Sequence, residues 1–185
     1  MRWFRCSFAA VLFSVAATTP AFADVARPAA AVPATFAPLQ FLLGNWSGAG
    51  TSDAGAGKGY DTFALDLDGF AVVRRSHAEY PGKDGKAPVT YDALMVVYKD
   101  PAAAQLRADY FDNGHVIRYT LQSGTDARVA RFVSDAAPGT PTFRLTYTGS
   151  DDGKSLDVTF EIAPPGSTTF SVLAAGRDTR IPAKE

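Results

Sequence analysis

The chain has 185 residues, of which 46% are apolar and 20% charged, enough for one globular domain and too few for two of ordinary size. The formal net charge is −1, from 18 Lys and Arg against 19 Asp and Glu, so no basic field over the whole chain favours nucleic acid as a partner. One Cys excludes an intrachain disulfide, and one Cys with two His offers too few donors for a structural zinc site, so we expect no metal.

The first 23 residues have the order of a secretory signal peptide. Arg2 and Arg5 precede an apolar run over residues 8–17, and small residues follow up to Ala23. The run is half of the roughly 20 apolar residues that a bilayer span needs, so we expect cleavage after Ala23, with an uncleaved anchor as the alternative. Cys6 then leaves with the leader. We expect a periplasmic or extracellular protein.

Residues 24–35 are nearly all Ala, Pro and Val and show no pattern that could bury a face, which is typical of a tether. Residues 36–43 are mostly apolar and are long enough for about two helical turns. No other stretch after the leader offers a long helical repeat, so we expect one short helix as a cap at the N-terminal end of the folded domain.

From Gly44 onward, β-rich runs alternate with residue pairs that favour positive φ, such as Asp68-Gly69 and Asn113-Gly114. Such pairs between strands are strong signals for β-hairpins. The spacing of these breaks predicts ten strands, at residues 45–51, 58–67, 70–80, 89–98, 104–112, 115–122, 127–134, 141–149, 154–163 and 168–175.

The expected strands alternate in polarity. Leu156, Val158 and Phe160 share one face, while Asp157 and Thr159 share the other, which indicates an antiparallel sheet with one wet side. No crossover helices exist to join parallel strands. Ten strands with short links would leave two exposed edges unless the sheet closed, so we predict an all-β, up-and-down antiparallel barrel over residues 36–180. An immunoglobulin-like sandwich is the alternative.

Residues 42–50, Leu-Leu-Gly-Asn-Trp-Ser-Gly-Ala-Gly, join the short helix to a glycine-punctuated strand. This stretch resembles the Gly-x-Trp opening of the calycin superfamily, which includes lipocalins, fatty-acid-binding proteins and nitrobindins. It looks most like the nitrobindins and a group of secreted bacterial lipocalin-like proteins, which the segments 110–115 and 160–166 also resemble. The resemblance implies a calycin-like barrel with an interior ligand site.

The resemblance also implies how the barrel closes. In many calycins a late Arg or Lys packs on the opening tryptophan, here Trp46, and Arg177 or Arg180 lies where that residue is expected. Gly44 suits the sharp turn from helix to strand. Nitrobindins bind haem iron through a His near the C-terminus of the domain, whereas the last His here is His115. We therefore expect no cofactor, with haem as an alternative that lacks this ligand.

The candidate ligand site consists of tyrosines with one cationic anchor. Arg74 and Arg75 are adjacent, so one of them faces the interior, and Arg75 or His77 is our expected anchor. Tyrosine rings that share a phase with apolar neighbours can line a cavity and turn their hydroxyls to a polar ligand group. By this criterion the expected lining residues are Tyr91, Tyr110 and Tyr119.

These features predict an exported barrel that binds a small, largely apolar molecule by desolvating it, with no membrane span once the leader is removed. No phosphate-binding Gly-x4-Gly-Lys motif or Gly-x-Ser-x-Gly elbow is present, and we assign no catalytic residue. One alternative is an isomerase or hydrolase that uses His77 or His115 for proton transfer. Another is an envelope interaction protein whose barrel is filled with side chains.

Overall fold

A computed structural model describes residues 31–182 except 54, 83–86 and 123. The expected signal peptide and residues 24–30 of the expected tether lie outside the described residues. The described chain forms ten strands and two short 3-10 helices, η1 (Ala34–Leu42) and η2 (Leu67–Gly69). The strands are β1 (Gly44–Ser52), β2 (Gly55–Asp66), β3 (Ala71–Tyr80), β4 (Val89–Lys99), β5 (Leu106–Phe111), β6 (Val116–Gln122), β7 (Val129–Ser134), β8 (Thr142–Gly149), β9 (Ser155–Ala163) and β10 (Ser171–Ile181).

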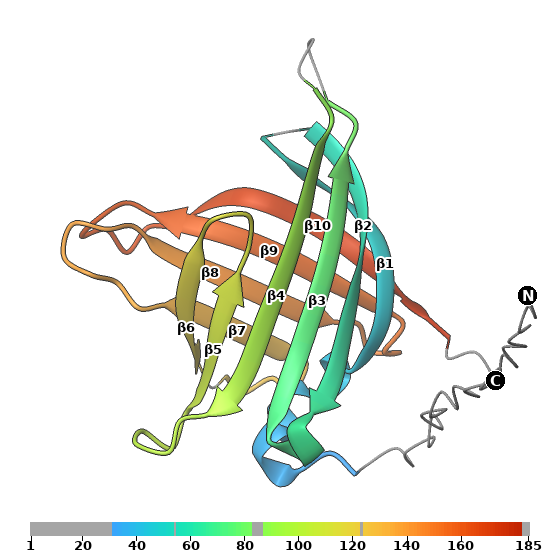
Figure 1. Cartoon of the computed structure of the whole chain (residues 1–185), viewed down its shortest axis with the longest axis vertical. Helices are drawn as coiled ribbons and strands as arrows, with labels where there is room; N and C mark the ends of the chain where they lie inside the picture. The colour runs from blue at the N-terminus through green and yellow to red at the C-terminus, as the bar shows by residue number, and fades with distance from the viewer. Residues whose placement is uncertain (1–30, 54, 83–86, 123, 183–185) are drawn as a thin grey trace, which may run out of the picture.

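The strands form one closed antiparallel barrel in which each strand pairs with its neighbours in sequence and β10 pairs with β1. The colours of Figure 1 follow this order around the wall, and red β10 lies beside blue-green β1. Gly69 and Gly114 have positive φ in the connections where hairpins were expected. The predicted ten-stranded up-and-down barrel is confirmed, and the sandwich alternative is wrong. One boundary differs clearly, because β10 continues to Ile181 instead of ending at residue 175.

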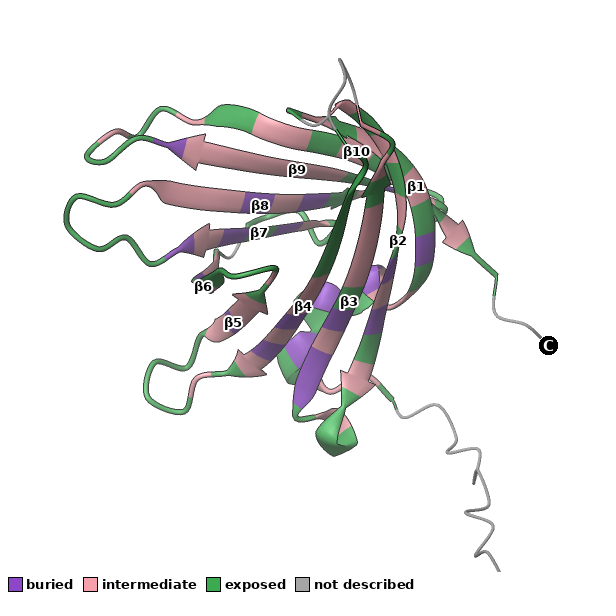
Figure 2. Ribbon diagram, turned by 45° about the horizontal axis from the view of Figure 1, so that its top comes forward, coloured by how far each residue is buried: buried purple, intermediate pink, exposed green. Residues whose placement is uncertain are grey.

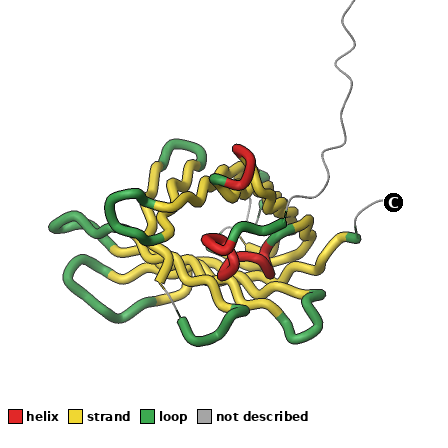
Figure 3. Tube along the Cα trace, turned by 90° about the horizontal axis from the view of Figure 1, so that it is seen from below, coloured by secondary structure: helices red, strands yellow, loops and turns green. Residues whose placement is uncertain are grey.

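The helix η1 closes one end of the barrel, which we call the floor; the opposite end is the mouth. Phe36, Leu39 and Leu42 are buried at a spacing of three, which puts them on one side of a 3-10 helix with three residues per turn. Seen from below, η1 lies inside the outline of the barrel (Figure 3). The helix starts at Ala34, so the last two residues of the expected tether belong to it.

A tryptophan and an arginine tie η1 to the wall. The Trp46 indole donates a hydrogen bond to the Leu42 carbonyl at 2.8 Å, and the Arg180 guanidinium carbon lies 4.1 Å from the indole ring centre. Arg180 also donates to the carbonyls of Leu43 (2.6 Å) and Phe41 (2.8 Å), which satisfies acceptors at the end of a helix. Gly44 makes the turn that follows with φ +126°, a conformation that other residues rarely adopt.

Of the two arginines that could cover Trp46, Arg180 takes this position. Arg177 lies on the other face of β10, where its Nε is 2.8 Å from the carboxylate of Asp157. The phase of the strand explains the difference, because residues 177 and 180 are separated by an odd number and point to opposite faces of the wall.

Buried side chains gather at the floor. In Figure 2 they mark η1 and the lower ends of β2, β3 and β4, whereas the ends of these strands at the mouth are largely intermediate or exposed. Together with Trp46 they form one hydrophobic cluster. Its other buried aromatic members are Phe36, Phe63, Tyr119, Phe132 and Tyr147.

Candidate functional site

The half of the barrel nearer the mouth encloses a cavity of about 410 Å³. Toward the mouth, its wall on β1, β2 and β10 has almost no side-chain volume, because the inward positions there are occupied by small residues that face one another in register. Gly48 pairs with Gly59, and Gly50 pairs with both Gly57 and Gly176. Such positions leave space that larger side chains fill at the floor. Apolar side chains of the adjoining strands β9 and β8 also line the cavity: Val158, Phe160 and Leu145.

A buried ion pair lies at the boundary between the cavity and the packed floor. Arg74 of β3 and Asp61 of β2 are only 9% and 7% exposed. Nε and one terminal nitrogen of Arg74 lie 3.0 and 2.9 Å from the same oxygen, Oδ1 of Asp61. The rings of Phe63 and Tyr147 lie 5.9 and 5.7 Å from the guanidinium carbon and add cation–π contacts. These contacts offset the free-energy cost of removing two charges from water. A buried arginine without a partner would have no such compensation.

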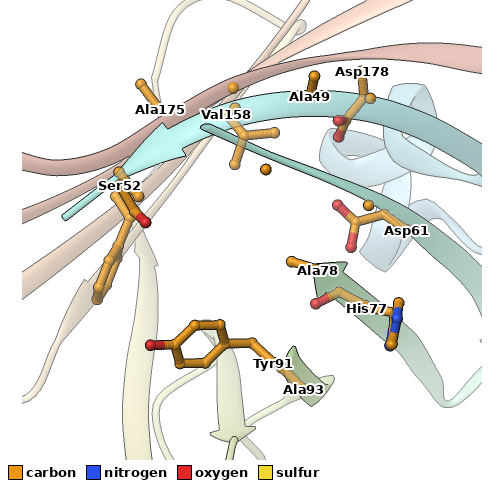
Figure 4. A pocket seen from close by; sticks show the side chains of 18 of the residues that line it. Ala49, Ser52, Asp61, His77, Ala78, Tyr91, Ala93, Val158, Ala175 and Asp178 are labelled. Carbon is orange, nitrogen blue, oxygen red and sulfur yellow. The ribbon is translucent and has the colours of Figure 1, made fainter. Parts of the chain in front are cut away.

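Asp178 of β10 joins this pair from across β1. It can do so because Gly48 of the intervening strand has no side chain, and a Cβ at that position would collide with the Asp178 carboxylate. Burial and the neighbouring, hydrogen-bonded carboxylate of Asp61 together raise the pKa of Asp178 to about 6, although Arg74 acts in the opposite direction. Figure 4 shows the carboxylates of Asp61 and Asp178 facing one another. The site therefore combines two carboxylates with one guanidinium, and Asp178 is the carboxylate whose pKa is raised.

The three expected tyrosines all border the cavity. Tyr110 and Tyr119 meet edge to face at 6.3 Å close to Arg74, and burial raises the pKa of both, so their hydroxyls stay neutral. Tyr91 lies nearer the mouth, 44% exposed, with its ring against that of Tyr80 at 5.7 Å. The rings thus span the cavity from the ion pair to the opening.

The structure corrects the choice of Arg75 as the anchor. Arg75 is exposed, and Arg74 takes the inward position on β3. The local pattern was ambiguous, because Val72 and Val73 before the arginines make both phases apolar. The neighbouring strand decides the phase: Arg74 is the residue whose side chain can reach Asp61.

The other candidate anchor, His77, borders the cavity but turns its ring away from it (Figure 4). The ring stacks on Tyr60 at 5.1 Å, and Nδ1 lies 2.7 Å from Oδ1 of Asp92, whose side chain is exposed. The hydrogen bond to Asp92 and a second one to Glu79 raise the pKa of His77. His115 is on a hairpin with its side chain 77% exposed. Neither histidine presents a proton-transfer group to the cavity.

Three residues of the site, Asp61, Arg74 and Asp178, were not among the candidates. For Arg74, the sequence indicated that one of the two adjacent arginines faces inward but did not indicate which one. Asp61 shares a phase with Phe63, a signal that was available in the sequence. Asp178 lay beyond the expected end of the last strand, so no phase was assigned to it.

Two features are absent from the described residues. No described helix combines the length and the apolar character that a bilayer crossing requires. Within the same residues, no cluster of three or more His, Cys, Asp or Glu side chains is arranged to hold a metal ion.

Comparison with known proteins supports the fold. No protein-family model matches this chain, and no curated protein sequence does. Among solved structures, the chain is similar to one described as "Crystal Structure of Rv2717c from M. tuberculosis", with a TM-score of 0.58 and 12% identity. The match covers 82% of this chain and 100% of the other. At this identity the likeness concerns the barrel alone.

Proposed function

We propose that the protein binds a small, largely apolar molecule inside the barrel. The observation that carries this proposal is the cavity of about 410 Å³ above a sealed floor. Its volume lies in the range of small-molecule sites, roughly 300–1,000 Å³, and such sites combine apolar walls with a few polar groups. Here the walls strip water from the apolar part of the ligand, and the group around Arg74 orients its polar end.

The two alternatives have less support. An interaction protein with a filled barrel would have side chains where the cavity lies. An enzyme that relies on His77 or His115 would need an imidazole directed inward, and both rings are on the outer side. Binding without chemistry needs only the space and the side chains that already line the cavity.

A neutral probe tests the proposal without involving the charged groups. We expect isothermal titration calorimetry to detect 1-octanol binding to the full chain. Ala93→Leu adds volume inside the cavity and should weaken binding at least about tenfold. The larger side chain occupies space that octanol needs and removes apolar contacts between octanol and the wall. Ala64→Leu on the exposed face of β2 is the matched control and should bind as the unaltered chain does.

The result that overturns the proposal is equally concrete. If octanol gives no heat of binding, and native mass spectrometry of protein from its own host shows no co-purified small molecule, the cavity is not a binding site.

We also propose that the protein acts outside the cytoplasm, which rests on the signal-peptide pattern of residues 1–23. Intact-mass measurement of the secreted or periplasmic protein should give a chain that starts at Asp24. A cell fractionation that recovers only the full-length chain in the cytoplasm would contradict this.

A further inference from the structure

We propose that the ligand carries a protonated amine, which Asp178 and Asp61 bind, while its apolar body extends past the tyrosines toward the mouth. This inference rests on the proposed function and specifies the chemical class of the ligand. It depends on the placement of three charged side chains from three different strands at the inner end of one cavity.

The balance of charge at this end favours a cation. Both short contacts of Arg74 go to Asp61, so the positive charge is already neutralised before a ligand enters. Asp178 is a second carboxylate that faces Asp61 (Figure 4), and the cation that acts on it is the same Arg74. When Asp178 is ionised, the inner end of the cavity therefore carries one net negative charge.

A carboxylate ligand does not suit this arrangement. To reach Arg74 it would have to displace Asp61, and it would then lie beside Asp178 in a site where water screens charges poorly. Like charges brought together in this way cost binding energy. A site built for a carboxylate would have an arginine without an acidic partner.

A protonated amine fits the same groups. An ammonium has three N–H donors and no acceptor. The carboxylate oxygens of Asp61 and Asp178 can accept hydrogen bonds from these donors. Tyr110 and Tyr119 border the same space, and aromatic rings are favourable neighbours for a cation. The ligand's charge thus takes the place that a proton occupies at lower pH.

The arrangement makes amine binding depend on pH. The groups that face Asp178 are Asp61 from β2 and Arg74 from β3, while Gly48 on the strand between them has no side chain. The pKa of Asp178 is about 6, so its carboxylate is mostly ionised at pH 7.5 and mostly protonated at pH 5. An alkylammonium stays charged at both values, so a loss of affinity at pH 5 reports the protein's own titration.

Three probes with the same chain and different heads test the proposal: octylammonium, 1-octanol and octanoate, titrated calorimetrically into the full chain. At pH 7.5 we expect octylammonium to bind at least about tenfold more tightly than octanoate. Octylammonium affinity should fall about tenfold at pH 5, in line with the ionised fraction of one carboxylate. Asp178→Asn should remove both effects, and Asp157→Asn on the outer face should preserve them.

The outcomes separate this proposal from the broader one. If octanol binds but octanoate binds as well as octylammonium, the amine proposal is wrong and the binding function stands. The amine proposal is also wrong, and the binding function again stands, if Asp178→Asn keeps the preference for the amine. If none of the three probes binds, the binding function itself fails. Should Asp178→Asn not fold, as judged by its thermal melt, the pH dependence of the unaltered chain still decides the question.

Discussion

The floor and the mouth of the barrel are built from the same strands but differ in what faces inward. Along β1 the inward side chains pass from Trp46, which is 1% exposed, to Gly48 and Gly50, which contribute no volume. Along β10 they pass from Arg180 over the indole to Gly176 on the cavity wall. Closure of the sheet alone therefore does not create a ligand-sized cavity. The volume of alternate residues on a few strands decides whether the interior is packed or hollow.

The two halves also differ in energetics. The floor buries large apolar and aromatic side chains and satisfies helix-end carbonyls through Arg180, so it is the main source of stability. The cavity half forgoes this burial and keeps a carboxylate, Asp178, whose ionisation is opposed by its surroundings. Binding sites commonly hold groups that a structure optimised only for stability would lack.

The largest effect is expected where the two halves meet. Arg74→Met leaves the Asp61 carboxylate buried without its cation, and breaking a buried pair in this way costs about 3–5 kcal/mol. Urea unfolding followed by tryptophan fluorescence measures the change. Arg75→Met, one residue along the same strand but exposed, should stay within about 0.5 kcal/mol. Equal effects of the two substitutions would show that the ion pair is not a special feature of the interior.

The floor can be weakened without touching the cavity. Arg180→Ala removes hydrogen bonds to the carbonyls of Phe41, Leu43 and Gly153 and the cation–π contact with Trp46, and we expect a loss of about 2–3 kcal/mol. Octanol affinity should not change under conditions in which the variant is folded. Arg177→Ala removes only an exposed pair with Asp157 and should cost less than about 1 kcal/mol. A large loss of octanol binding in Arg180→Ala would mean that floor and cavity are coupled.

The same substitution in each half compares their packing directly. Ala108→Leu adds volume to the floor, where the side chain is fully buried, and overpacking there should cost about 1–3 kcal/mol. Ala93→Leu adds the same volume beside the cavity, where space exists, and should change the free energy of unfolding by less than about 1 kcal/mol. Thermal unfolding of the two variants measures both values. Similar costs at both positions would argue that the cavity half is as tightly packed as the floor.

The sequence predicted the fold well because hairpin turns and polarity alternation are local signals. Each strand pairs with its neighbours in sequence, so finding the turns was enough to find the topology. The end of β10 was missed because Gly176 and two charged residues after Ala175 do not look like a strand. Pairing with β1 over eight register positions, from Ser52 with Ala174 to Asn45 with Ile181, keeps that segment extended.

The site was harder to predict because it depends on contacts between distant residues. The tyrosines shared their phase with apolar neighbours, so a local rule placed them on the cavity. The phase of Arg74 was set by its partner on another strand, and Asp178 reaches Asp61 only because Gly48 lies between them. No single strand contains this information, because these contacts follow from the register of four strands, β3, β2, β1 and β10.

The smallest effect is expected in the pH dependence of stability and concerns Asp178 alone. Its pKa is about 6 in the folded chain against an ordinary value of 3.8, so between these values the folded state holds a proton that the unfolded state has lost. Stability linked to this group is therefore present at low pH and lost as the pH rises toward and through 6. Asp178→Asn cannot ionise and should escape this loss of stability. We expect the variant to be more stable than the unaltered chain at pH 7.5, by only about 1–2 kcal/mol because solvent screens part of the unfavourable interaction of the ionised carboxylate.

Urea unfolding of both proteins from pH 4 to 8 measures the difference. A difference that stays constant over this range would show that Asp178 titrates normally and that its carboxylate carries no strain for a bound amine to relieve.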